Sequence, residues 1–148
     1  MYIISSCLLG KNCKYNGGNN YNDGVVEFCK NHSYYTVCPE GCSGLKTPRP
    51  PAEIVGDKVI DKNGKDVTAF FIRGAEISLL QSIEYGEEIG EKIEGAILKS
   101  KSPSCGCEQV YDGTFSNVLV EGDGYFAALL KKNGIEIKSE KEITNGKF

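Results

Sequence analysis

The hydrophobic pattern of this 148-residue chain predicts short buried strands separated by amphipathic helices. Three apolar or β-branched runs stand out, at residues 2–5, 34–37 and 95–99. Each run leads directly into a segment of turn-forming residues that contains a cysteine. The pattern therefore predicts three strands that deliver cysteines to loops of similar position.

Helical periodicity fills the intervals between these strands. Residues 24–32 predict a short helix, and residues 67–90 a longer one with apolar positions three or four residues apart. A third helix is expected at 125–132, ended by an Asn-Gly pair, with a last strand at 135–137. The alternation predicts a single α/β domain spanning 1–148, built in three layers from a mainly parallel sheet with helices on both faces, in a Rossmann-like arrangement.

In such open sheets the ligand site lies beyond the carboxyl ends of the strands, where the three cysteine loops would converge. A segment with three prolines, residues 45–54, precedes a predicted hairpin at 55–61. Its rigidity could hold Arg49 or Glu53 at a site, because a proline-locked segment loses less entropy on ordering. The alternative is an ordinary surface loop in which Arg49 makes an exposed ion pair. The last eight residues are polar enough to predict fraying.

Charge and hydropathy narrow the function classes. The net charge is -3, and the lysines are scattered among glutamates rather than gathered into the basic patch of a nucleic-acid-binding protein. The first apolar run is too short for a signal peptide. No stretch approaches the roughly 18 apolar residues that a membrane-spanning helix requires. We therefore expect a cytoplasmic protein with a small-molecule substrate and with no nucleic-acid or membrane partner.

The chain contains seven cysteines, and in a reducing cytosol cysteines near turns are more often metal ligands or reactive thiols than disulfides. Thiolate ligands favour zinc or iron–sulfur clusters over hard cations. Cys42 and Cys107 follow other cysteines closely enough to suggest a four-thiolate zinc site, although the Cys-x-Cys spacing at Cys107 is too tight for a zinc knuckle. Either of them could also be a sulfur-accepting thiol or an apolar filler, and Cys29 is expected to be filler. The role of Cys13 stays open.

The histidine content weighs against a cysteine protease. His32 is the only histidine, and it stands at the predicted end of a helix, where a capping role is expected. No second histidine could activate a thiolate.

Ser102 and Ser104 flank a proline, and their ordinary interpretation is as turn residues that hydrogen-bond the local backbone. We accept that reading for Ser104.

Several motifs follow one another along the chain: Ser6-Cys7-Leu8-Leu9-Gly10, Tyr15-Asn16-Gly17, Cys38-Pro39-Glu40, Thr47-Pro48-Arg49-Pro50-Pro51-Ala52-Glu53, Asp66-Val67-Thr68, Gly74-Ala75, Lys99, Ser102-Pro103-Ser104-Cys105-Gly106 and Tyr111-Asp112-Gly113-Thr114-Phe115. Together they resemble the thiouracil desulfidase family, which was long known only as a domain of unknown function. The resemblance extends over about residues 3–140, almost the whole chain.

The resemblance implies an enzyme with a 4Fe-4S cluster held by Cys7, Cys38 and Cys105. One iron would have no protein ligand and would act as a Lewis acid on the sulfur of a thiolated pyrimidine. The C=S bond would be cleaved without redox change, which releases uracil and sulfide. The residues closest to this chemistry would be Glu40 and Ser102.

The same resemblance places Arg49, Glu53 and Lys99 at the substrate and implies an oxygen-sensitive hydrolase. Water or the hydroxyl of Ser102 could attack the ring carbon, and Glu40 could carry the proton. The alternative function is a non-catalytic metal-binding module, with structural zinc or a fully ligated cluster. Three protein ligands would favour catalysis, whereas four would close the site.

Overall fold

A parallel sheet of four strands forms the centre of the computed structural model, which describes residues 1–148. The strands are β1 (Tyr2–Ser5), β2 (Tyr34–Val37), β5 (Gly95–Leu98) and β8 (Ile137–Ser139), arranged in the order β2-β1-β5-β8. All three neighbouring pairs are parallel, so their carboxyl ends meet at one edge. This confirms the predicted parallel sheet.

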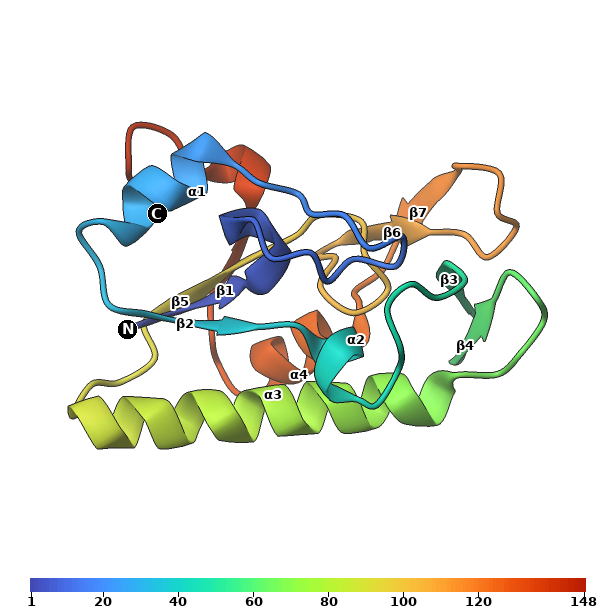
Figure 1. Ribbon diagram of the computed structural model, residues 1–148, viewed down its shortest axis with the longest axis horizontal. Helices are drawn as coiled ribbons and strands as arrows, with labels where there is room; N and C mark the ends of the chain where they lie inside the picture. The colour runs from blue at the N-terminus through green and yellow to red at the C-terminus, as the bar shows by residue number, and fades with distance from the viewer.

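Helices cover both faces of the sheet, as Figure 1 shows. The helical elements are η1 (Ser6–Leu9), α1 (Asp23–Cys29), α2 (Pro39–Cys42), α3 (Thr68–Ile89), α4 (Tyr125–Lys132) and η2 (Glu140–Glu142). The long helix α3 and helix α4 lie on one side of the sheet, and α1 lies on the other. The predicted three-layer α/β domain is thus confirmed.

The core reflects the alternation of side chains along each strand. Ile3 and Leu98 are fully buried in the cluster that includes α3 and α4, whereas Ile4 and Ile97 are buried in the cluster that includes η1 and α1. Burial on both faces explains why the strands read as continuous apolar runs rather than as alternating ones.

Two antiparallel hairpins stand beyond the carboxyl ends of the sheet, at the right of Figure 1. They are β3 (Ala52–Val55) with β4 (Lys58–Asp61), and β6 (Gln109–Tyr111) with β7 (Leu119–Glu121). The first hairpin turns at a Gly-Asp pair, as expected, but the second was not predicted. The short helix α2 was also not predicted from the sequence.

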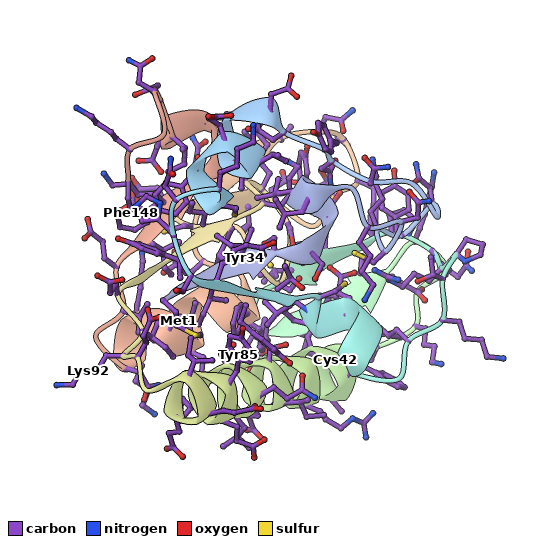
Figure 2. All side chains as sticks on the ribbon, turned by 60° about the vertical axis from the view of Figure 1, so that its left-hand side comes forward. Met1, Tyr34, Cys42, Tyr85, Lys92 and Phe148 are labelled. Carbon is purple, nitrogen blue, oxygen red and sulfur yellow. The ribbon has the colours of Figure 1, made fainter.

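The two ends of the chain lie near each other, on the side of the sheet opposite the hairpins (Figures 1 and 2). The Phe148 ring contacts the rings of Tyr2 and Phe28. His32 caps the end of α1, as predicted, since its Nδ1 lies 2.8 Å from the carbonyl oxygen of Phe28. That the last eight residues fray stays a prediction, which the contacts of Phe148 would oppose. None of the helices is long and apolar enough to cross a membrane.

Helices α2 and α3 approach each other at Gly74, where a Cβ would come within 1.9 Å of the carbonyl oxygen of Pro39. Cys42 lies between these helices (Figure 2), and its thiol donates to the carbonyl oxygen of Gly74 at 3.5 Å. Backbone atoms cannot yield as a side chain can, so even a methyl group would push α2 away.

We therefore expect Gly74→Ala to lower the free energy of unfolding by at least about 1–3 kcal/mol, the usual cost of overpacking. Denaturant unfolding would measure the change, with Glu84→Ala on the exposed face of the same helix as the control. Equal stability of the two variants would show that α2 and α3 can separate freely.

Candidate functional site

A cavity of about 530 Å³ opens at the carboxyl edge of the sheet, between the strand ends and the two hairpins. Residues from the loops after β1, β2 and β5 line one part of it, and residues of both hairpins line the rest. The lining includes every candidate site residue predicted from the sequence: Cys7, Cys38, Glu40, Arg49, Glu53, Lys99, Ser102 and Cys105. Residues that lie far apart in the chain thus meet around one space.

The three candidate cysteine ligands each follow one central strand. Cys7 lies in η1, Cys38 is the N-cap of α2, and Cys105 lies in the turn after β5. The side-chain amide of Asn20 donates to the Sγ of Cys7 at 3.3 Å. The backbone N–H of Gly41 donates to the Sγ of Cys38 at 3.4 Å.

Burial and hydrogen bonding shift the pKa values of these three thiols in different directions. Burial raises the pKa of Cys7 and of Cys105, because the thiolate is poorly solvated there. The pKa of Cys38 is lowered, first by a hydrogen bond with the Cys13 thiol and then by the Gly41 N–H. Cys38 therefore loses its proton more readily than the other two thiols, whose thiolates need a nearby cation.

This difference predicts the order of labelling in the metal-free protein. Iodoacetamide reacts with thiolates, so at pH 7 we expect Cys38 to be alkylated before Cys29, whose pKa burial raises to about 11. Both residues are partly exposed, which makes Cys29 a fair comparison. Peptide mass spectrometry over a labelling time course would measure the two rates. Faster labelling of Cys29 would contradict the assignment.

The remaining cysteines are distributed differently. Cys13 is buried and lines the cavity beside Cys38, whereas Cys29, Cys42 and Cys107 do not line it. Cys42 instead hydrogen-bonds across the contact between α2 and α3. No group of three or more His, Cys, Asp or Glu side chains is clustered tightly enough to hold a single metal ion. Cys7, Cys38 and Cys105 all line the same cavity.

Glu40 is held at the cavity by two contacts. Its Oε1 accepts from the Nε of Arg49 at 3.2 Å, and its Oε2 accepts from the hydroxyl of Ser104 at 2.9 Å. The Glu40–Arg49 ion pair is largely buried, so removing either partner would leave an uncompensated charge. The carboxylate is therefore fixed in position before any ligand arrives.

Ser104 connects Glu40 to Ser102. The two serine hydroxyl oxygens lie 3.0 Å apart. Ser102 Oγ also accepts from the backbone N–H groups of Ser104 and Cys105, at 3.1 and 3.0 Å. The prediction that Ser104 is only a turn residue is wrong, because its side chain reaches Glu40, 64 positions away in the chain. Ser102 has the turn contacts and also lies on the cavity wall.

Arg49 uses most of its donors inside the protein. Its Nη1 donates to the Lys46 carbonyl and the Thr47 hydroxyl, and its Nη2 donates to the Cys13 carbonyl at 2.9 Å. With the Nε–Glu40 bond, four of its five N–H groups have protein partners. Arg49 therefore ties three loops together and leaves one N–H for another acceptor.

Glu53 and Lys99 both line the cavity. Glu53, only 8 % exposed, accepts through Oε1 from two backbone N–H groups of the β6–β7 loop, and Oε2 has no hydrogen-bond partner. Lys99 Nζ donates to the carbonyl and hydroxyl oxygens of Ser100 and lies 3.8 Å from Glu140. Each residue thus combines an internal contact with a place on the cavity wall.

Positive charge is concentrated here although the whole chain is acidic. The cavity lining contains two carboxylates, Glu40 and Glu53, and five cationic side chains. The cationic residues are Lys14, Arg49, Lys62, Lys99 and Lys101. An excess of cations opposes the repulsion among several thiolates brought into one space.

The sequence and the fold of this chain are similar to those of known proteins. Residues 2–142 match the family model described as 2-thiouracil desulfurase. An uncharacterized protein of Bacillus subtilis (strain 168), YbbK, is 36 % identical over 155 residues, which cover 98 % of this chain and 99 % of that protein. The solved structure of the [4Fe-4S]-dependent thiouracil desulfidase TudS superimposes with a TM-score of 0.85 at 39 % identity, covering 96 % of this chain and 91 % of TudS.

Proposed function

Because the chain belongs to the 2-thiouracil desulfurase family, we propose that it removes sulfur from a small thiolated pyrimidine at a 4Fe-4S cluster bound in the cavity. The observation that carries the proposal is the convergence of Cys7, Cys38 and Cys105 on one cavity that also contains the fixed carboxylate of Glu40. The solved structure that this chain matches is described as a [4Fe-4S]-dependent thiouracil desulfidase.

The donor set fits the cluster. Cys7, Cys38 and Cys105 would hold it, since thiolates are the usual ligands of iron–sulfur clusters and hydrogen bonds already reach two of these sulfurs. When bound, the cluster supplies an iron without a protein ligand, a Lewis acid toward the sulfur of the substrate. The cationic lining favours the deprotonated state of the thiolates.

The serine pair orients the carboxylate of Glu40 through a chain of hydrogen bonds. An ionised Glu40 has no proton to donate, so the hydroxyl of Ser104 donates to it, and the hydroxyl of Ser102 must then donate to Ser104. Both lone pairs of Ser102 are occupied by backbone N–H groups. This favours water over Ser102 as the nucleophile.

In the proposed reaction, water adds to the ring carbon and gives a proton directly to Glu40. The C–S bond then breaks, the added hydroxyl loses its proton to the leaving sulfur, and the carbonyl of uracil forms. One thiouracil and one water give one uracil and one hydrogen sulfide, with no electron donor. The ionised Glu40 is regenerated when its proton passes to the leaving sulfur.

Three further residues would bind the pyrimidine. The free Oε2 of Glu53 can accept a ring N–H, and Lys99 and the remaining N–H of Arg49 can donate to a ring carbonyl. These groups recognise a planar ring with alternating donors and acceptors, as a free base or a nucleoside rather than a nucleic acid. We also expect a cytoplasmic, oxygen-sensitive hydrolase, because an iron without a thiolate is readily lost in air.

The alternative function is a metal-binding module without catalysis, and Cys13 is the observation that favours it. As a fourth thiol on the cavity wall, Cys13 could complete the coordination and close the site. A Cys13→Ser variant separates the two functions. Unchanged cluster content and turnover support the open site, whereas cluster loss in this variant supports the closed one.

The direct test is turnover of 2- and 4-thiouracil by protein reconstituted with iron and sulfide under anaerobic conditions. We expect equal amounts of uracil and sulfide without an added reductant, and no product after the metal is removed with a chelator. A loaded protein that leaves both thiouracils intact would refute the proposed activity.

A further inference from the structure

The loop between β6 and β7 has an unusual backbone. Gly113, Phe115 and Asn117 all have positive φ angles, of 93°, 58° and 62°. Glycine tolerates this region freely and asparagine fairly well, but a bulky aromatic residue there is strained. Phe115 is thus held in a conformation that its own side chain disfavours.

A buried carboxylate from the other hairpin holds the loop in place. Oε1 of Glu53, on β3, accepts from the backbone N–H groups of Gly113 at 3.0 Å and of Phe115 at 3.1 Å. Glu53 forms no ion pair, so these two N–H groups are the contacts that stabilise its charge. Asp112 tightens the same loop, accepting from the N–H and hydroxyl of Thr114.

The strained residue stands at the cavity. Phe115, Tyr111 and Asn117 line it together with Glu53, whereas Val118 and Val120 of the same hairpin point to solvent. Backbone strain that the surroundings enforce is typical of ligand clamps. Phe115 is half-buried and lines the same cavity as Glu53, so an apolar aromatic side chain and a hydrogen-bond acceptor face one space.

We propose that Phe115 is a specificity-determining residue that covers the face of the pyrimidine ring, with Glu53 positioning the loop that carries it. The inference rests on the proposed function and adds to it the residue that selects a planar aromatic substrate. An aromatic ring stacks on a nucleobase regardless of its substituents, so Phe115 would contribute equally to binding of substrate and product.

Phe115→Gly tests this directly, because glycine removes the ring and also relieves the backbone strain. We expect KM for thiouracil and the Kd for uracil, measured by calorimetry, each to rise about tenfold, the typical effect of losing one base–aromatic stack. We expect kcat to stay unchanged, as for a residue that binds ground and transition states equally. The melting temperature should not fall. Phe115→Tyr, which keeps an aromatic ring, should bind uracil as the parent does. Val118→Ala on the same hairpin is the matched control and should also bind as the parent does.

The results of these measurements distinguish a failure of the proposed role of Phe115 from a failure of the proposed desulfidase activity. An active parent whose uracil affinity is unchanged in Phe115→Gly overturns the role of Phe115 and leaves the activity intact. A lower melting temperature with unchanged uracil affinity would make Phe115 a packing residue and also overturn the inference. A parent that binds uracil through Phe115 but does not desulfurate thiouracil would refute the activity and support the ring-binding role.

Discussion

Replacing Cys105 by serine should leave the reconstituted protein without its cluster and without desulfidase activity. The Cys105 side chain is buried at the cavity wall, where a serine hydroxyl stays protonated and is a poor ligand for iron. Changes to groups that merely orient a ligand cost roughly ten- to a hundredfold, so loss of a ligand itself should lower activity by more than about a hundredfold. Iron and acid-labile sulfide per chain, measured with turnover, give the result.

The other cysteines provide the controls for this experiment. Cys7→Ser and Cys38→Ser should behave like Cys105→Ser, because each contributes one thiolate to the same cavity. Cys42→Ser and Cys107→Ser should keep cluster and activity, since neither residue lines the cavity. Retention of a full cluster in any of the first three variants would rule out the proposed ligand set.

Glu40→Gln should lower kcat by about 10²–10⁴, the range expected for loss of a general acid–base group. The glutamine amide is nearly the same size and can still accept a hydrogen bond, but it cannot take a proton from water. Because Glu40 does not belong to the ligand set, iron content should be preserved. The loss of its charge leaves the buried Arg49 without a counterion, so a lower melting temperature is expected, but the glutamine oxygen can still accept from Arg49 and hold the fold. Turnover at fixed cluster content measures the effect.

An exposed substitution provides the comparison for Glu40. Glu27 lies on α1 and does not line the cavity, so Glu27→Gln should leave kcat unchanged. Ser104→Ala should have a smaller effect than Glu40→Gln, because water can replace the hydroxyl between Ser102 and Glu40. If Glu40→Gln turned over as fast as the parent, proton transfer would have to be assigned to another residue.

The fold could be predicted largely because its central strands are buried on both faces. Such strands read as short apolar runs, and the helices between them require a parallel sheet. The short helix α2 was missed because its four residues include proline and glycine, and its contacts with α3 stabilise it more than its own propensity does. The second hairpin was missed because only one of its strand residues, Val110, is buried, so the strands give no clear apolar signal.

The candidate site was predicted only in part, because the sequence pattern locates residues that follow strands but not residues brought in by contacts between loops. Cys7 and Cys38 follow strands directly, so topology alone places them at one edge. Ser104, Cys13 and Phe115 join the site through contacts between distant loops, which no local spacing encodes. The Tyr-Asp-Gly-Thr-Phe motif was the one available signal for Phe115, and its role depends on Glu53, 62 positions away.

The most direct test of the central claim is an iron titration of activity. Metal-free protein is reconstituted anaerobically with increasing iron and sulfide, and thiouracil turnover is measured against cluster content in each sample. We predict that activity rises in proportion to the cluster and levels off at about four irons and four sulfides per chain. Activity in the metal-free protein, or equal activity with zinc alone, would contradict the assignment of a 4Fe-4S desulfidase.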